Sequence, residues 1–137
     1  MAEHTTNYTD TFIAVSEDCP VDQAEVPASK ASPSVAEMQF KLLHDHPYRF
    51  TSDDLLFAVH AERNGIPESE RKEARALFFS KGQACMRASP LTKRYGFGIH
   101  NDAQGRIALV PLGTKEYDRF SRDKQLKQVR GMRSKRS

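Results

Sequence analysis

The stretch between residues 80 and 106 combines side chains that could bind an anion with one that could act as a nucleophile. Arginine presents a planar fork of donors that matches phosphate or carboxylate, and lysine adds a point charge. No acidic residue occurs between Glu73 and Asp102, so these cations have no close neighbour in the sequence to neutralise them. The pattern predicts an anion-binding surface, and the alternative is a solvated loop paired with the acidic N-terminal segment. The predicted ligand-binding residues are Lys81, Arg87, Lys93, Arg94, His100 and Arg106.

Cys85 and His100 are the candidates for catalysis. Cys85 lies between Lys81 and Arg87 in the sequence, and nearby cations lower the pKa of a thiol and raise its thiolate fraction. His100 is the nearest histidine along the chain that could serve as its base. Free cysteines are more often buried packing residues. We therefore expect a structural Cys85 and keep a thiol-dependent enzyme as an alternative.

No metal or cofactor is predicted from the remaining candidate ligands. His44 and His46 lie two residues apart, and on a helix such residues point about 200° away from each other. Cys19 and Cys85 are too far apart in the sequence for a zinc motif, which needs four ligands at short spacings. In the cytosol both thiols are expected to be reduced.

Gly96 and Gly98 leave one face of a predicted strand without side chains. Such a bare face indicates the close approach of another backbone, a helix or a ligand, and internal packing is the more frequent cause. If a ligand binds there, His100 and Arg106 are its neighbours by strand alternation. The Gly-Phe-Gly spacing lacks the third glycine and the following helix of a nucleotide-binding motif.

The elements that must position these residues predict an α+β fold. A strand is expected over 11–16, followed by a proline-rich loop and three short helices over about 33–46, 52–63 and 67–81. The hydrophobic period then changes from 3.6 to 2, which predicts a β-hairpin over about 95–112. A last helix is expected from Thr114 to about Arg122. This order of elements is typical of an α+β domain.

Charge is distributed unevenly along the 137 residues, although the net charge is only +3. Residues 1–29 contain six carboxylates and no Lys or Arg, whereas residues 124–137 contain six Lys or Arg and no carboxylate. We expect a single α+β domain over 1–123 and a basic C-terminal tail over 124–137. The tail could dock onto the domain through Leu126, Val129 and Met132, which lie three residues apart. The two ends could neutralise each other, or the tail could contact nucleic acid.

The expected location is the cytoplasm, with no membrane partner. No apolar run approaches the roughly 18 residues that a membrane span requires. The acidic start MAEHTTNYTD is unlike a signal peptide, which has a basic region followed by an apolar one.

Three parts of the chain resemble an uncharacterised family of small bacterial proteins. They are the block from Ser80 to Gly98, the start from Asn7 to Val15 and the MRSKR ending. The family is a domain of unknown function of about the length of this chain. The resemblance covers nearly the whole chain. It implies a bacterial source and one stand-alone domain, and it assigns no activity, ligand or functional residue.

We therefore expect a non-catalytic binding or regulatory module whose ligand is an anionic small molecule or an acidic partner surface. The second hypothesis is nucleic-acid binding, because three short helices and a hairpin also follow the order of a winged-helix domain. Against it, the would-be recognition helix begins with Glu68, Glu70 and Glu73, which would face phosphates. The oligomeric state stays open.

Overall fold

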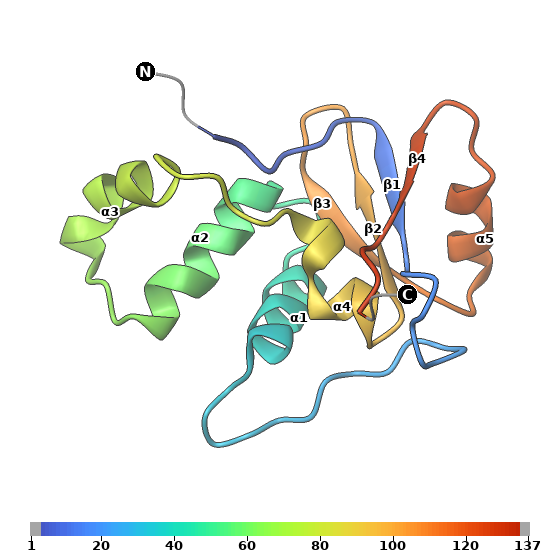
Figure 1. Cartoon of the computed structure of the whole chain (residues 1–137), viewed down its shortest axis with the longest axis horizontal. Helices are drawn as coiled ribbons and strands as arrows, with labels where there is room; N and C mark the ends of the chain where they lie inside the picture. The colour runs from blue at the N-terminus through green and yellow to red at the C-terminus, as the bar shows by residue number, and fades with distance from the viewer. Residues whose placement is uncertain (1–3, 135–137) are drawn as a thin grey trace.

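The protein is an α+β fold, as the sequence predicts, built on a four-stranded mixed sheet with helices on both faces (Figure 1). The structure, a computed structural model, describes residues 4–134. The strands lie in the order β3-β2-β1-β4. They are β1 (Thr11–Ala14), β2 (Phe97–Asn101), β3 (Ile107–Pro111) and β4 (Lys127–Arg130). The helices are α1 (Val35–Asp45), α2 (Ser52–Arg63), α3 (Arg71–Phe78), α4 (Pro90–Lys93) and α5 (Lys115–Ser121).

Strand β1 lies inside the sheet and is covered on both faces. It pairs antiparallel with β2 and parallel with β4. Because side chains alternate along a strand, Phe12 and Ile13 point to opposite faces. Ile13 packs with Leu43 and Leu55 of α1 and α2, whereas Phe12 packs with Tyr117 of α5. The sheet is therefore the middle of three layers, with a separate hydrophobic core on each side.

The predicted hairpin is confirmed as β2 and β3. Ile99 pairs with Leu109, and the register places His100 opposite Ala108. The Asp102 side chain closes the turn, because its carboxylate accepts hydrogen bonds from the backbone N–H groups of Gln104 (2.9 Å) and Arg106 (2.8 Å). This short-range chemistry explains why the hairpin is evident in the sequence.

The caps of the first two helices follow the sequence in part. Ser34 caps α1 by accepting from the Glu37 N–H (3.2 Å), but the Glu37 carboxylate accepts from the Lys30 N–H instead of completing a capping box. Thr51 caps α2, and with Asp54 it forms the full reciprocal box. The segment between these helices pairs with β3 through the hydrogen bond from the Tyr48 N–H to the Ile107 carbonyl (2.9 Å).

Two observed elements leave no clear pattern in the sequence. The basic loop contains a short 3-10 helix, Met86–Ala88, followed by α4, which Ser89 caps by accepting from the Leu91 N–H. The segment expected to be a tail contains β4, whose Val129 packs against the Ile13 core. Two cations of the expected tail, Lys135 and Arg136, lie outside the described residues.

Close internal packing explains the bare strand face. Gly98 lies against the rings of Phe12 and Tyr117, and Gly96 lies against Val21 and Ala24 of the proline-rich loop. The face therefore receives α5 and a loop, and no room is left beside Gly98 for a ligand.

Substituting Gly98 with alanine should destabilise the protein. A Cβ atom at Gly98 would lie 2.7 Å from Cζ of Phe12 and 3.0 Å from Cε2 of Tyr117, both in the core. We expect the free energy of unfolding in urea to fall by about 1–3 kcal/mol, as in overpacked cores. Gly82→Ala is the matched control, because the nearest atom to its Cβ would be 3.8 Å away. Equal stability of the two variants would contradict this account of the glycine.

Candidate functional site

The structure distributes the six predicted anion ligands over three places instead of one pocket. Lys81 follows α3 at one end of the molecule and lines a hollow with His60. Arg87, Lys93 and Arg94 belong to the helical turns before β2, and His100 and Arg106 belong to the hairpin.

The basic loop is joined to the basic C-terminal segment by backbone contacts. The Nε atom of Arg87 donates to the Arg130 carbonyl (2.6 Å), and the Met132 N–H donates to the Arg87 carbonyl (2.7 Å). Gly131 lies against Thr92, where a Cβ atom would be only 2.9 Å from the threonine Oγ1. Two segments that are about forty residues apart therefore lie side by side, and both are rich in cations. We call their cations the cationic surface: Arg87, Lys93, Arg94, Lys127, Arg130 and Arg133.

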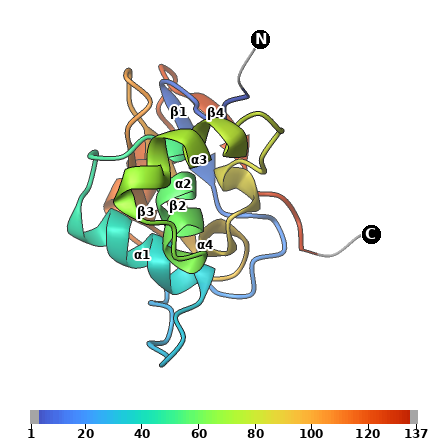
Figure 2. The ribbon, with the colours of Figure 1, turned by 90° about the vertical axis from the view of Figure 1, so that its left-hand side faces the viewer.

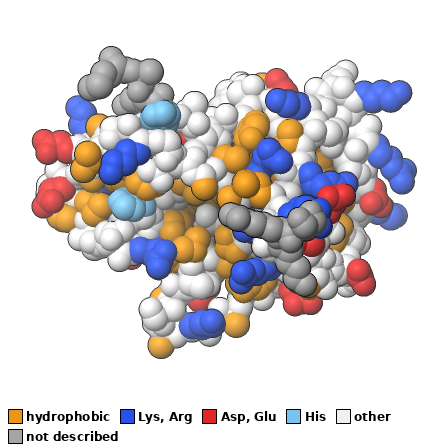
Figure 3. All heavy atoms as spheres, viewed as in Figure 1, with side chains coloured by type: hydrophobic (Ala, Val, Ile, Leu, Met, Phe, Trp, Pro, Cys, Tyr) orange, Lys and Arg blue, Asp and Glu red, His pale blue; other side chains and the backbone are white. Residues whose placement is uncertain are grey.

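None of these six cations forms an ion pair within residues 4–134. The ion pairs found there use His44, Arg71, Arg75 and Arg119. The Asp18 carboxylate lies beside this surface, where it accepts hydrogen bonds from the backbone N–H of Ser134 at 2.9 and 3.1 Å. In Figure 3, basic side chains are visible beside the C-terminal segment, with acidic side chains among them.

The cationic surface includes the outer edge of the sheet. The N–H groups of Lys127 and Gly131 donate to carbonyls of the β1 segment, those of Asp10 and Ala14. Since hydrogen-bonding groups alternate along a strand, those of Gln128 and Arg130 point the other way. The Arg130 carbonyl accepts from Arg87, and the side chains of Lys127, Gln128 and Arg130 are exposed. β4 therefore presents a short, partly open edge fringed by cations.

His100 lies away from this edge, under α5. Its Nδ1 atom is 2.8 Å from the Tyr48 hydroxyl, and its ring stacks on Phe120 with 4.3 Å between centroids. Burial lowers the pKa of His100, and the carboxylates of Asp102, Asp123, Asp10 and Glu116 oppose this shift. The histidine joins α5, the sheet and the segment before α2, which is a packing role.

The structure does not pair Cys85 with His100. The Cys85 Sγ atom is 3.6 Å from the Tyr8 hydroxyl. Tyr8 packs against the Ile13 core, whereas the His100 partner Phe120 packs against the Phe12 core on the opposite face of the sheet. Burial and the Cys85 contact raise the pKa of Tyr8, so its hydroxyl stays protonated and is no base for the thiol at neutral pH.

The arrangement of the hairpin differs from a freely projecting wing. Here β2 pairs with both β3 and β1, and Ile99 and Ile107 are fully buried. The hairpin strands are thus part of the core, which disfavours the winged-helix interpretation, and nucleic-acid binding stays a prediction.

Asp53 and Asp54 do more than complement the start of α2. The buried Asp53 carboxylate accepts three hydrogen bonds of 2.7 Å, from the Thr5 hydroxyl and from the N–H and hydroxyl of Thr6, and so anchors the N-terminal segment. Asp54 pairs with Arg75 of α3 at 2.9 Å. Burial alone would raise the pKa of Asp54, but hydrogen bonds from Thr51 and Arg75 lower it overall. The two acids fasten separate segments to α2.

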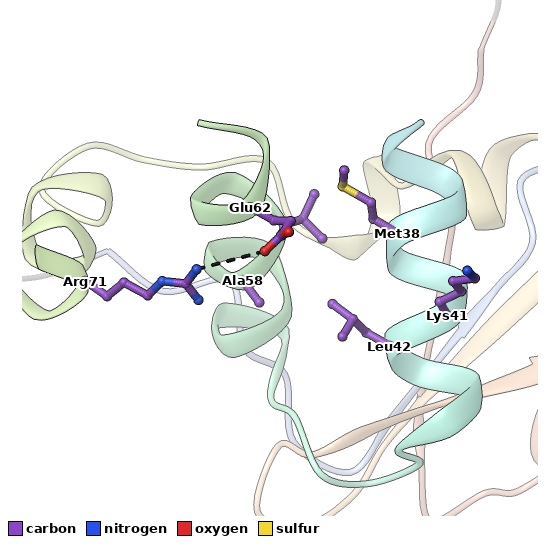
Figure 4. Close-up of a pocket in the computed structure, with 7 residues that line it drawn as sticks. Met38, Lys41, Leu42, Ala58, Glu62 and Arg71 are labelled. Carbon is purple, nitrogen blue, oxygen red and sulfur yellow. Dashed lines mark ion pairs between the residues drawn. The ribbon is translucent and has the colours of Figure 1, made fainter. Parts of the chain in front are cut away.

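A groove of about 300 Å³ lies between α1 and α2, and nothing in the sequence singles it out. Its walls are apolar, and Figure 4 shows Met38 and Leu42 of α1 facing Ala58 and Glu62 of α2. The Glu62 carboxylate is 3.9 Å from the Arg71 guanidinium at the rim. None of the predicted anion ligands lines this groove, so it does not serve the anion hypothesis.

Within residues 4–134, no group of three or more His, Cys, Asp or Glu side chains is arranged to hold a metal ion. In the same range, every helix is too short or too polar to cross a bilayer.

The fold and surface define a small α+β protein with a buried N-terminal strand and a basic sheet edge. The chain belongs to a family of unknown function (DUF6157), whose model matches residues 3–137, so the expected membership of an uncharacterised family is confirmed. Comparisons with curated proteins and with solved structures find no match.

Acidification should weaken the fold through His100. Because burial lowers the pKa of the folded imidazole below 6.5, the unfolded chain binds the proton more readily, and stability falls as pH drops through that value. We expect wild type to lose more unfolding free energy than His100→Gln between about pH 7.5 and about pH 5.5. An imidazole pKa of His100 above 6.5 by NMR titration would contradict the prediction.

Proposed function

We propose that this protein is a non-catalytic binding module whose cationic surface binds an acidic partner surface. One observation carries the proposal: two basic segments from distant parts of the chain are held together by a side-chain-to-backbone and a backbone hydrogen bond, and their six cations form no ion pair within residues 4–134. Concentrated charge of one sign attracts a partner of the other sign. The ligand contacts then become Arg87, Lys93 and Arg94 of the predicted set, joined by Lys127, Arg130 and Arg133.

The shape of the surface favours a macromolecule over a small molecule. Small-molecule sites are concave and enclose most of their ligand. Arg130 belongs to an open hollow of about 350 Å³ with Ala14, Ser121 and Gln128, and the other cations are spread along the neighbouring segments. An extended partner could contact several of these cations at once.

The edge of β4 supports a peptide segment as the part of the partner that binds. The outward backbone groups of Gln128 and Arg130 can pair with an added strand, which is a common mode of peptide recognition. An acidic segment would bring its carboxylates next to Lys127 and Arg130. The six residues of the cationic surface include no aromatic ring on which bases could stack, which disfavours single-stranded nucleic acid.

The proposal requires neither catalysis nor a cofactor. Cys19 and Cys85 are free thiols, which agrees with the cytoplasmic location expected from the sequence.

A double charge reversal, Arg94→Glu with Arg130→Glu, tests the surface with one substitution in each basic segment. The probe is a fluorescein-labelled peptide of alternating glutamate and threonine, measured by fluorescence anisotropy at low and at physiological ionic strength. We expect wild type to bind the peptide, with weaker binding at higher salt. The variant should bind at least about tenfold more weakly while its melting temperature stays unchanged.

Lys30→Glu with Arg63→Glu is the matched control, because both residues are exposed outside the cationic surface and the net charge changes equally. The control should bind as wild type does. An equal loss of peptide binding in the control would show that only the net charge matters, and it would overturn the proposed site. A single-stranded DNA probe that binds more tightly than the peptide would reassign the partner to nucleic acid.

A further inference from the structure

Helix α3 carries a partly exposed apolar face, on which Leu77 is exposed while Ile66 and Ala74 are half-buried against the Phe57 and Phe79 cluster. None of its side chains is buried, and Leu77 is 71% exposed. The helix is nonetheless held firmly to α2, through the Arg75–Asp54 ion pair (2.9 Å) and through Phe78, which packs against the Phe57 and Phe79 cluster. It lies at the outer end of the molecule, with α2 behind it (Figures 1 and 2). An exposed apolar face on a fixed helix is typical of a contact surface.

The face is charged with opposite signs at its two ends. Two hollows flank Leu77, and both are lined by Ile66, Ala74 and Leu77. The larger, of about 500 Å³, also contains Lys81. The smaller, of about 290 Å³, also contains Glu70 and Glu73. We call these residues the α3 face: Ile66, Glu70, Glu73, Ala74, Leu77 and Lys81.

We propose that the α3 face binds a second copy of itself, with the two α3 helices antiparallel. Glu70 lies four residues before Ala74, and Lys81 lies four residues after Leu77. Glu70 ends the 3-10 turn before α3, and Lys81 lies beyond the last helical residue, Phe78. When Ala74 of one copy faces Leu77 of the other, the antiparallel pairing places the segment with Glu70 of each copy beside the segment with Lys81 of its partner. A two-fold axis then forms each contact twice, as in a closed symmetric dimer.

The charge pattern selects a second copy over other occupants. An anionic membrane or an acidic protein would be repelled by Glu70 and Glu73, and a basic partner would be repelled by Lys81. Neither Lys81 nor these two glutamates forms an ion pair within residues 4–134. A second copy of the same face offers a lysine to the two glutamates and glutamates to Lys81.

The expected dimer is weak and independent of the cationic surface. An eight-residue helix and its flanks are small beside the roughly 1,600 Å² of a standard interface, so we expect a dimer that forms only at high protein concentration. In Figure 1, α3 lies at the opposite end of the molecule from β4 and α5, so both surfaces can be occupied at once.

Sedimentation velocity of the full chain, from about 10 µM to about 1 mM, tests the dimer. Wild type should shift from monomer to dimer across this range. Leu77→Ser should stay monomeric with an unchanged melting temperature, because the side chain is 71% exposed. Val26→Ser is the matched control, since Val26 is 66% exposed and lies outside the α3 face, and it should dimerise as wild type does.

Charge reversal tests the antiparallel arrangement. Glu70→Lys and Lys81→Glu should each weaken dimerisation, and the Glu70→Lys/Lys81→Glu double variant should restore it, because the exchanged charges again face each other. A wild type that stays monomeric to about 1 mM would leave the face to a different partner and overturn the proposal. A dimer that survives Leu77→Ser, or a double variant without rescue, would also overturn it.

Discussion

The burial of β1 on both faces is the constraint on which the rest of the structure depends. Phe12 and Ile13 are adjacent in the sequence and both fully buried, yet they belong to different cores. Each core needs its own cover, so α5 must lie on one face and the layer of α1 and α2 on the other. A strand inside a sheet also needs a partner on each edge, and the hairpin and the C-terminal segment fill these places.

The position of β1 explains why the protein has a cationic surface at all. Once β4 pairs with β1, the chain beyond it must pass the basic loop, where Gly131 and Met132 contact Thr92 and Arg87. The charges of the two segments repel each other, and hydrogen bonds to backbone groups hold the segments in place. The acidic N-terminal segment contributes Asp18 to this region, where its carboxylate accepts from the Ser134 N–H. Cations concentrated in this way favour an acidic partner.

Helix α2 plays the corresponding role at the other end of the molecule. Its first turn holds the N-terminal segment through Asp53 and holds α3 through Asp54. The α3 face is therefore rigidly presented although α3 itself contributes no buried side chain. The protein thus has two surfaces with different chemistry, one rich in cations and one with opposite charges about an apolar centre. Together the two proposals describe a module that links a dimer to an acidic partner.

The sequence alone determined the elements whose signals are local. Alternation predicts β2 and β3, the residues around Thr51 predict the start of α2, and the side-chain-free face at Gly98 predicts close packing. Pairing between distant segments was decided by the tertiary structure, because it leaves no periodic pattern. Strand β4 is four residues long and mostly exposed, so only the free edge of β1 makes it a strand. The short separation of Cys85 and His100 in the sequence could not show that they lie on opposite faces of the sheet. The face that a loop covers depends on the topology of the whole sheet.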